Sequence, residues 1–254
     1  MSGRWPDRQV EHPLSLQRWE DLTFLHWPVP PATVQAVLPP GLAVDTFDGQ
    51  AWLGVTPFRM HARPAYGPAL PRLSTFPEVN LRTYVRGPDG GDGIWFFSLE
   101  CPRLPVVLAL RAAGVPYVRA DAEIHAAPGH LHYRTRRPGS GVGMHASVET
   151  GDPLEPDPLA DFLTGRWSAY VRRFGRLWRF DVHHEPWPLR KARARTAVAG
   201  LIAAAGLPAV IGEPLAHFSP GVRSRVGRPV LVGGRDHGPT AGARKPWSAG
   251  ARKP

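Results

Sequence analysis

The chain alternates between short apolar runs and turn-forming residues, and several of the runs have the two-residue period of β-strands. The clearest is Thr75–Val85, which a glycine-rich turn over Gly87–Gly93 separates from a second run, Ile94–Leu99. Successive side chains of a strand point to opposite faces of the sheet. One face of the first run therefore carries Val79, Leu81 and Val85, and the other carries Phe76, Glu78, Asn80, Arg82 and Tyr84.

Turn signals join other runs into three predicted β-hairpins, and short helices are predicted between the strands. The predicted hairpins are Leu42–Phe47 with Gln50–Met60 around the turn Asp48-Gly49, Leu131–Arg137 with Val142–Glu149, and Arg166–Arg173 with Arg176–His184. Proline or aspartate at the start, or glycine or proline at the end, predicts helices at Pro31–Leu38, Pro102–Ala113, Asp157–Gly165 and Thr196–Ala205. Strands outnumber helices and mostly follow one another as hairpins. The predicted fold class is therefore α+β, mostly antiparallel β, and not a parallel βαβ fold.

The length of 254 residues and an apolar content of 43% favour one large domain. We expect this domain to span residues 19–222, with an N-terminal arm over 1–18 and a basic tail rich in Pro, Gly and Ala over 223–254. The pentapeptide GARKP occurs twice in that tail. Its composition predicts disorder, because it offers little apolar surface to offset the entropy of ordering.

Most of the positive charge lies at the C-terminus. Eight basic residues and one acidic residue occur between Gly221 and Pro254, so this segment carries +7 of the net charge of +10. A basic domain would suggest a nucleic-acid partner. Because the charge sits on the tail and forms no compact basic block, we expect no specific nucleic-acid partner. A solvated tail and an electrostatic arm for nucleic acid or anionic lipid are the two readings of this segment.

Several signals of other protein classes are missing from the sequence. No apolar stretch has the roughly 20 residues of a membrane span, and Met1–Leu14 lacks the apolar core of a secretory signal, so we expect a cytoplasmic protein without membrane partners. The single Cys101 excludes a disulfide framework, and pairs such as His130 and His132 have no third ligand, so no metal is expected. No phosphate loop or dinucleotide fingerprint is present, and no cofactor is expected. A homo-oligomer is compatible with the sequence.

Runs distributed over most of the chain resemble one bacterial family. They include Leu38–Leu42, Ala51–Gly54, Phe76–Val85, His184–Leu189 and His217–Val222. Together these runs resemble the YqjF-like family, whose function is unknown. That family is similar in fold to acetoacetate decarboxylase. The resemblance implies a closed, cone-like antiparallel β-barrel with a small-molecule cavity.

The resemblance to the decarboxylases also permits a test of mechanism. Those enzymes form a Schiff base through a lysine in a Gly-x-Pro-Lys-Lys run. The matching run here is Gly114-Val115-Pro116-Tyr117-Val118, and the chain has no lysine before Lys191. An imine mechanism is therefore not expected, and Lys191 is expected to be a solvated surface residue.

The candidate ligand-binding residues are centred on the strand Thr75–Val85. Glu78 matches a cavity glutamate of the decarboxylases, and Asn80 and Arg82 share its face. Glu78 and Arg82 lie about 13 Å apart along a strand and are not expected to pair, so Arg111 is a candidate partner for Glu78. A buried ion-pair network is the alternative to a ligand site. Tyr117, from the lysine run, and His26, from a family motif, complete the candidate set.

Three functions are compatible with these residues. The first is a β-barrel that binds a small anionic or carbonyl-bearing molecule. The second is an enzyme that acts by non-covalent acid–base or electrostatic catalysis through Glu78 and arginines. The third is a structural or partner-binding module with a filled barrel. A deep cavity lined by Glu78 would favour the first two over the third.

Overall fold

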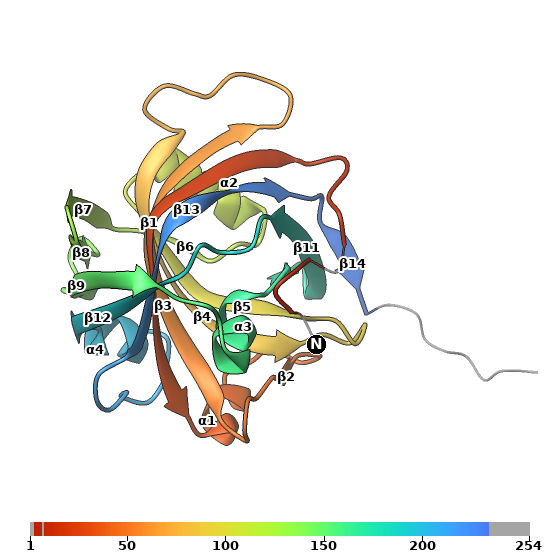
Figure 1. Cartoon of the computed structure of the whole chain (residues 1–254). Helices are drawn as coiled ribbons and strands as arrows, with labels where there is room; N and C mark the ends of the chain where they lie inside the picture. Colours follow the sequence, from red (N-terminus) through yellow and green to blue (C-terminus); the bar gives the residue numbers. More distant parts are fainter. Residues whose placement is uncertain (1–2, 7, 234–254) are drawn as a thin grey trace, which may run out of the picture.

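A computed structural model describes residues 3–6 and 8–233 of the chain. Strands dominate it, and the helices are short (Figure 1). The strands are β1 Ser15–Val29, β2 Ala43–Val44, β3 Ala51–Pro64, β4 Thr75–Arg86, β5 Asp92–Cys101, β6 Tyr117–Arg119, β7 Asp121–Ala127, β8 His130–Arg136, β9 Gly143–Pro153, β10 Ser168–Arg173, β11 Arg176–His184, β12 Arg190–Ala197, β13 Leu215–Val226 and β14 Val230–Val232. The helices are α1 Pro31–Gln35, α2 Leu104–Ala112, α3 Pro158–Thr164 and α4 Ala199–Ala203. In this part of the chain no helix is long and apolar enough to cross a membrane.

The strands form one mostly antiparallel sheet. Its order is β14-β11-β10-β5-β4-β3-β1-β13-β12-β9-β8-β7, with β2 paired to β4 and β6 paired to β5. Only the β10–β5 and β5–β6 pairs are parallel. Strand β11 pairs with β10 and also with β13, so the pairs that run through β5, β4, β3 and β1 lead back to β11. The predicted fold class, mostly antiparallel β with a few short helices, is confirmed.

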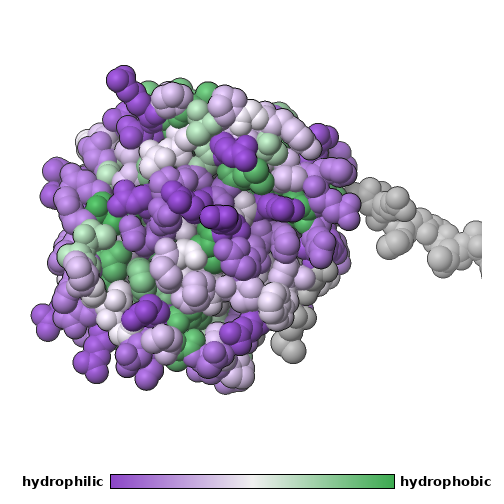
Figure 2. Space-filling model, turned by 45° about the horizontal axis from the view of Figure 1, so that its top comes forward, coloured by the Kyte–Doolittle hydropathy of each residue, from purple (hydrophilic) through white to green (hydrophobic). Residues whose placement is uncertain are grey.

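The two faces of the central strands have different neighbours. Val79, Leu81 and Val85 of β4 belong to the largest apolar cluster, together with residues of β8, β9 and α4. Phe76, on the opposite face of β4, belongs to a second cluster with residues of β1, β3 and α2. The alternation predicted from the sequence for this strand is therefore confirmed. On the outside of the molecule, hydrophilic residues predominate and hydrophobic residues form scattered patches in the view of Figure 2.

Most of the predicted local elements are present, but one hairpin is wrong. The pairs β8–β9 and β10–β11 match two of the predicted hairpins, and all four predicted helices occur in shorter form. Around Asp48-Gly49, only Phe47 and Gln50 are bridged. Strand β2 pairs with β4 and not with β3, because β4 occupies the hydrogen-bonding edge of β3. The Asp-Gly turn is correct, whereas the extended hairpin is not.

The sequence analysis missed several strands, including β1 and β13, which pair with each other. Strand β1 shifts register between Glu20 and Leu25, and Asp21 has a positive φ of 51°, so the two-residue period is interrupted. Strand β13 contains Pro220 and Gly221, which normally indicate a turn. At Gly221, φ is 135° and a Cβ atom would lie 2.0 Å from the carbonyl oxygen of Trp19. Glycine is required here because the backbones of β1 and β13 approach so closely.

The ends of the described chain extend the regular structure. Strand β1 begins at Ser15, inside the segment predicted as an arm, and β13 and β14 continue past residue 222 to Val232. The predicted tail falls mainly on residues 234–254, which lie outside the described residues.

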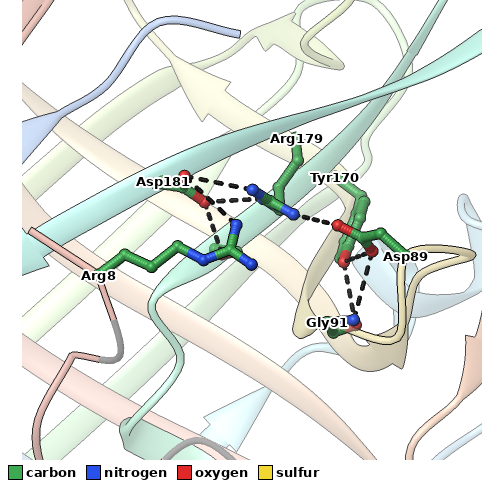
Figure 3. A network of polar contacts seen from close by, with 7 residues as sticks. Arg8, Asp89, Gly91, Tyr170, Arg179 and Asp181 are labelled. Carbon is green, nitrogen blue, oxygen red and sulfur yellow. Dashed lines mark hydrogen bonds and ion pairs between the residues drawn. The ribbon is translucent and has the colours of Figure 1, made fainter. Parts of the chain in front are cut away.

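Two networks of ion pairs and hydrogen bonds connect strands of the sheet with neighbouring turns and connections. Arg179 on β11 pairs with Asp181 on the same strand and with Asp89 in the β4–β5 turn (Figure 3). The Tyr170 hydroxyl lies 2.9 Å from Asp89 Oδ1 and from the carbonyl oxygen of Gly91. Nearby, Arg166 Nη1 lies 2.7 Å from Asp45 Oδ2 and 3.0 Å from Asp92 Oδ2. The first network joins β10 and β11 to the turn that connects β4 with β5, and the second joins the segment before β10 to β5 and to the segment after β2.

Candidate functional site

A cavity of about 640 Å³ lies on the face of β4 that carries Phe76, Glu78, Asn80 and Arg82. The rest of its lining comes from β1, β3, β5, β6, α2, α3, β10, β11 and β13 and from connections between elements. Most of the lining side chains are apolar. The polar lining residues include Glu78, Asn80 and Arg82 of β4, and Thr56 of the neighbouring strand β3 is the register partner of Asn80.

Glu78 and Tyr117 form a buried pair in this cavity. The Tyr117 hydroxyl donates a hydrogen bond of 2.7 Å to Glu78 Oε2. Burial raises the pKa of Glu78 to about 7, although the Tyr117 hydrogen bond acts in the opposite direction. Burial and the adjacent Glu78 carboxylate raise the pKa of Tyr117 well above its usual value. Near neutral pH, Glu78 can therefore hold or release a proton, while Tyr117 stays protonated.

Arg82 places a guanidinium group in the same cavity. Its side chain is buried, and the guanidinium carbon lies 5.3 Å from the ring centre of Phe24 and 5.9 Å from that of Tyr84. Burial raises the pKa of Tyr84, whereas the charge of Arg82 and its hydrogen bond with the Tyr84 hydroxyl act in the opposite direction. Within the described residues, Arg82 forms no ion pair with a carboxylate, and its Nε has no hydrogen-bond partner. As predicted, Glu78 and Arg82 do not pair with each other.

Two further cavity groups have unused hydrogen-bonding capacity. Asn80 Oδ1 and Thr56 Oγ1 are buried and have no partner among the described residues. Buried polar atoms are normally hydrogen-bonded, and each exception needs an explanation. Together with Arg82 Nε, these atoms make a polar region that can both donate and accept hydrogen bonds.

Gly54 on β3 makes room for the Arg82 side chain. It is the register partner of Arg82 across the β3–β4 pair. A Cβ atom at this position would lie 3.3 Å from Arg82 Cγ and Nε and 3.2 Å from His26 Cδ2. The glycine at the end of the Ala51–Gly54 motif therefore has a packing role, which sequence reasoning did not identify.

Arg111, proposed from the sequence as the partner of Glu78, is not part of this arrangement. It lies exposed in the last turn of α2 and does not line the cavity. The face of a short helix that contacts the sheet could not be fixed from residue spacing alone. The partner of Glu78 is Tyr117, which occupies the position of the decarboxylase lysine. Tyr117 lies on β6, and the parallel pairing of β6 with β5 brings it beside Glu78.

His26 lies behind the cavity wall and not in its lining. Its Nε2 is 2.6 Å from the Tyr84 hydroxyl, which in turn donates a 2.7 Å hydrogen bond to the Leu163 carbonyl oxygen. Burial, followed by the nearby Arg82 and His217, lowers the pKa of His26 well below its usual value. A neutral His26 supports Tyr84, which contacts Arg82, so its connection to the site is indirect.

Other reactive groups lie outside the site or are unsuited to it. Burial raises the pKa of Cys101 to about 12, which opposes formation of a thiolate. Lys191 is exposed on β12, and no lysine lines the cavity in the described part of the chain. Across those same residues, no group of three or more His, Cys, Asp or Glu side chains is arranged to hold a metal ion.

The sequence analysis also missed residues that reach the cavity from distant segments. Arg166 and Trp187 line it. The His184–Leu189 motif contains Trp187, so its resemblance to the family was an available signal for that residue. No local pattern placed Arg166 there, because its position depends on the ion pairs with Asp45 and Asp92.

Comparison with known structures identifies proteins of the same fold. The chain superposes on the enduracididine biosynthesis enzyme MppR complexed with pyruvate, with a TM-score of 0.65 and 15% identity, over 89% of this chain and 93% of that one. An acetoacetate decarboxylase-like enzyme from Sphingomonas wittichii RW1 gives a TM-score of 0.62 and 14% identity, over 89% and 96% of the chains. Acetoacetate decarboxylase from Legionella pneumophila gives 0.62 and 13%, over 87% and 88%. The fold is therefore acetoacetate decarboxylase-like.

Comparison of sequences gives a nearer relative. The uncharacterized protein YqjF of Bacillus subtilis is 33% identical over 229 residues, which cover 86% of this chain and 94% of YqjF. Residues 16–223 match the family DUF2071, described as an uncharacterized conserved protein. As the resemblance of its motifs implied, the chain belongs to this family, which includes YqjF-like proteins.

Proposed function

We propose that this protein binds a small anionic, carbonyl-bearing molecule in a closed, cone-like β-barrel, with the anionic group at Arg82. The return of the strand pairs to β11 supports barrel closure. The observation that carries the proposal is the buried Arg82 guanidinium, which faces a cavity of about 640 Å³ and has no carboxylate partner among the described residues.

A buried charge without a partner lowers the stability of the folded state by roughly several kcal/mol. Such charges are therefore rare where they have no function. An anionic ligand would supply the missing partner for Arg82. The Thr56 hydroxyl, which has no partner among the described residues, would donate a hydrogen bond to an oxygen of the ligand, and the protonated form of Glu78 would donate one to a carbonyl oxygen. The related MppR structure contains pyruvate, which makes this acid a suitable first probe.

The binding test uses the tryptophans of the cavity as reporters. Trp19 and Trp187 line it, so an occupied cavity should change their fluorescence. We expect pyruvate or acetoacetate to bind saturably, and Arg82→Met to weaken binding by about tenfold or more. Arg111→Met is the matched control, because it also removes one positive charge but lies outside the cavity. Equal affinities for the wild type and Arg82→Met would contradict the proposal.

The proposal excludes an imine intermediate. Tyr117 replaces the lysine of the Gly-x-Pro-Lys-Lys run, and Lys191 is exposed on β12. Treatment with borohydride in the presence of pyruvate or acetoacetate should therefore leave the intact mass unchanged. A reduced adduct located on Lys191 by peptide mass spectrometry would overturn this exclusion.

A second candidate function is acid–base catalysis at the same site. It is favoured by one observation, the buried Glu78 with a pKa of about 7 beside Tyr117. A general base is most effective when its pKa lies near the working pH. The Glu78 carboxylate would take a proton from the carbon next to the ligand's carbonyl group. The electron pair of that C–H bond would form a carbon–carbon double bond, and the π pair of the carbonyl group would move to its oxygen, whose negative charge Arg82 would stabilise.

Exchange of the methyl protons of pyruvate for deuterium, followed by NMR in deuterated water, tests this second function. We expect exchange above the uncatalysed rate with the wild type and its loss in Glu78→Gln. Binding without any exchange would restrict the protein to the first function. The third function considered from the sequence, a filled structural barrel, is disfavoured by the volume of the cavity.

A further inference from the structure

The cavity is larger and more apolar than a short acid requires. Cavities of roughly 300–1,000 Å³ typically hold drug-sized ligands, and this one has about 640 Å³. Apolar side chains enter it from several strands around the ring and from the connection after β11, among them Leu22, Phe58, Phe96, Phe180, Val182 and Trp187. A bound pyruvate would satisfy Arg82 but leave most of these walls in contact with water.

The apolar lining continues to the outer edge of the cavity. Leu14, just before β1, and Leu70, between β3 and β4, both line it, and they are 53% and 51% exposed. At this end of the cavity, most lining residues belong to the β3–β4 connection and to the start of β1. Large apolar side chains that are exposed together at the mouth of a cavity typically mark a binding surface. The polar groups on β4, by contrast, are nine-tenths or more buried.

The charges of the cavity restrict the polar end of a ligand to one negative charge. Among the described residues that line the cavity, Arg82 is the buried guanidinium that has no carboxylate partner. Arg166 is already shared by two aspartates, and Arg63 at the rim is hydrogen-bonded to the carbonyl oxygens of Pro64 and Gly67. A second negative charge would find no further buried guanidinium without a carboxylate partner among the described residues that line the cavity. Phosphate esters and dicarboxylates therefore fit the site poorly.

We infer that the ligand is an amphipathic monocarboxylate, whose carboxylate binds Arg82 and whose alkyl or aryl body lies against the apolar walls toward Leu14 and Leu70. This inference rests on the proposed function and names the class of molecule that the same site accepts. The body of the ligand supplies the apolar contacts that the walls lack in the empty cavity. Each methylene that becomes fully buried tightens binding by roughly fourfold.

The test compares straight-chain acids by titration of tryptophan fluorescence in the full-length protein. The probes are butanoate, hexanoate and octanoate, together with 1-octanol and pyruvate. We expect octanoate to bind at least about tenfold more tightly than butanoate and pyruvate, because four further methylenes are buried. We also expect octanoate to bind more tightly than 1-octanol, and Arg82→Met to remove that difference.

A second variant tests the apolar wall without altering Arg82. Ala109 on α2 lines the cavity and is itself exposed, so Ala109→Phe should fold while it narrows the apolar part. We expect a smaller gain in affinity from butanoate to octanoate in this variant. An unchanged gain would contradict the placement of the ligand body, and circular dichroism confirms that the variant is folded.

The outcomes separate this inference from the proposed function. If pyruvate and butanoate bind in an Arg82-dependent way but octanoate binds no more tightly, the amphipathic ligand class is wrong and the proposed function stands. If octanoate and 1-octanol bind equally and Arg82→Met changes neither, the cavity binds apolar molecules without the charge, and both are wrong. Failure of every acid to bind would overturn both as well.

Discussion

Two buried arginines of this molecule, Arg166 and Arg82, have different electrostatic environments. Arg166 is almost fully buried, is shared by Asp45 and Asp92, and stacks on Phe162 at 4.1 Å. Arg82 is also buried and also lines the cavity, but it has no carboxylate partner in the described chain. The first arrangement is complete without any further molecule, whereas the second is not. Burial alone therefore does not distinguish an arginine with a structural role from one that binds a ligand. The presence or absence of carboxylate partners does.

The largest expected effect comes from breaking the complete network. Arg166→Met removes the guanidinium shared by two buried aspartates, so we expect the free energy of unfolding to fall by about 3–5 kcal/mol. Chemical denaturation measures this loss. Arg86→Met is the control from the same network, because Arg86 pairs with Asp45 but its side chain is 45% exposed. We expect it to cost less than about 1 kcal/mol, and a comparable loss in both variants would remove the contrast.

The next largest effect is a pH dependence that belongs to Glu78. A carboxyl group whose pKa is raised from 4.5 to about 7 by folding binds its proton more tightly in the native state. Its contribution to stability is therefore complete below pH 4.5, falls as the pH rises, and is lost above about pH 7. This group alone accounts for up to about 3 kcal/mol over that interval.

Comparison of wild type with Glu78→Gln isolates this contribution. Buried histidines such as His26 and His184 have lowered pKa values, so they destabilise the fold as the pH falls, with the opposite sign. Because both proteins contain them, their effect cancels in the difference. We expect the unfolding free energy of wild type minus that of Glu78→Gln to decrease steadily from pH 5 to pH 7. A difference independent of pH would show that Glu78 titrates normally.

A smaller effect is expected from filling the space beside Arg82. Gly54→Ala places a methyl group 3.2–3.3 Å from His26 and Arg82, so both must shift by a few tenths of an ångström. We expect a loss of about 1 kcal/mol in unfolding free energy and a clear loss of carboxylate affinity. Thermal unfolding and fluorescence titration measure the two quantities. Unaltered affinity would mean that the position of Arg82 does not control binding.

The smallest effect on stability is expected from the residue on which binding depends. Arg82→Met removes a buried charge that has no carboxylate partner, so the unfolding free energy should change by less than about 1 kcal/mol or rise. Measured beside Arg166→Met, it tests the contrast directly. A loss of about 3 kcal/mol or more would place Arg82 in the structural group, and the site would lose its main support.

The sequence by itself determined the local features of this protein. The two-residue period of Thr75–Val85 placed Glu78, Asn80 and Arg82 on one face, and the structure puts that face against the cavity. The hairpins β8–β9 and β10–β11 and the Asp157 cap of α3 were also predictable. These features depend on neighbours within a few residues, so a local pattern is enough to specify them.

Only the tertiary structure decided which distant groups meet. Strand β1 interrupts its own period at Asp21, and β2 leaves its sequence neighbour β3 to pair with β4. Glu78 receives its hydrogen bond from Tyr117 and not from Arg111, and Arg166 is neutralised by Asp45, 121 residues away. Such pairings depend on how strands from the whole chain are ordered around one sheet. The neighbours of a residue in the sequence do not specify that order. The partner of each buried charge, which distinguishes Arg166 from Arg82, is therefore known only from the folded chain.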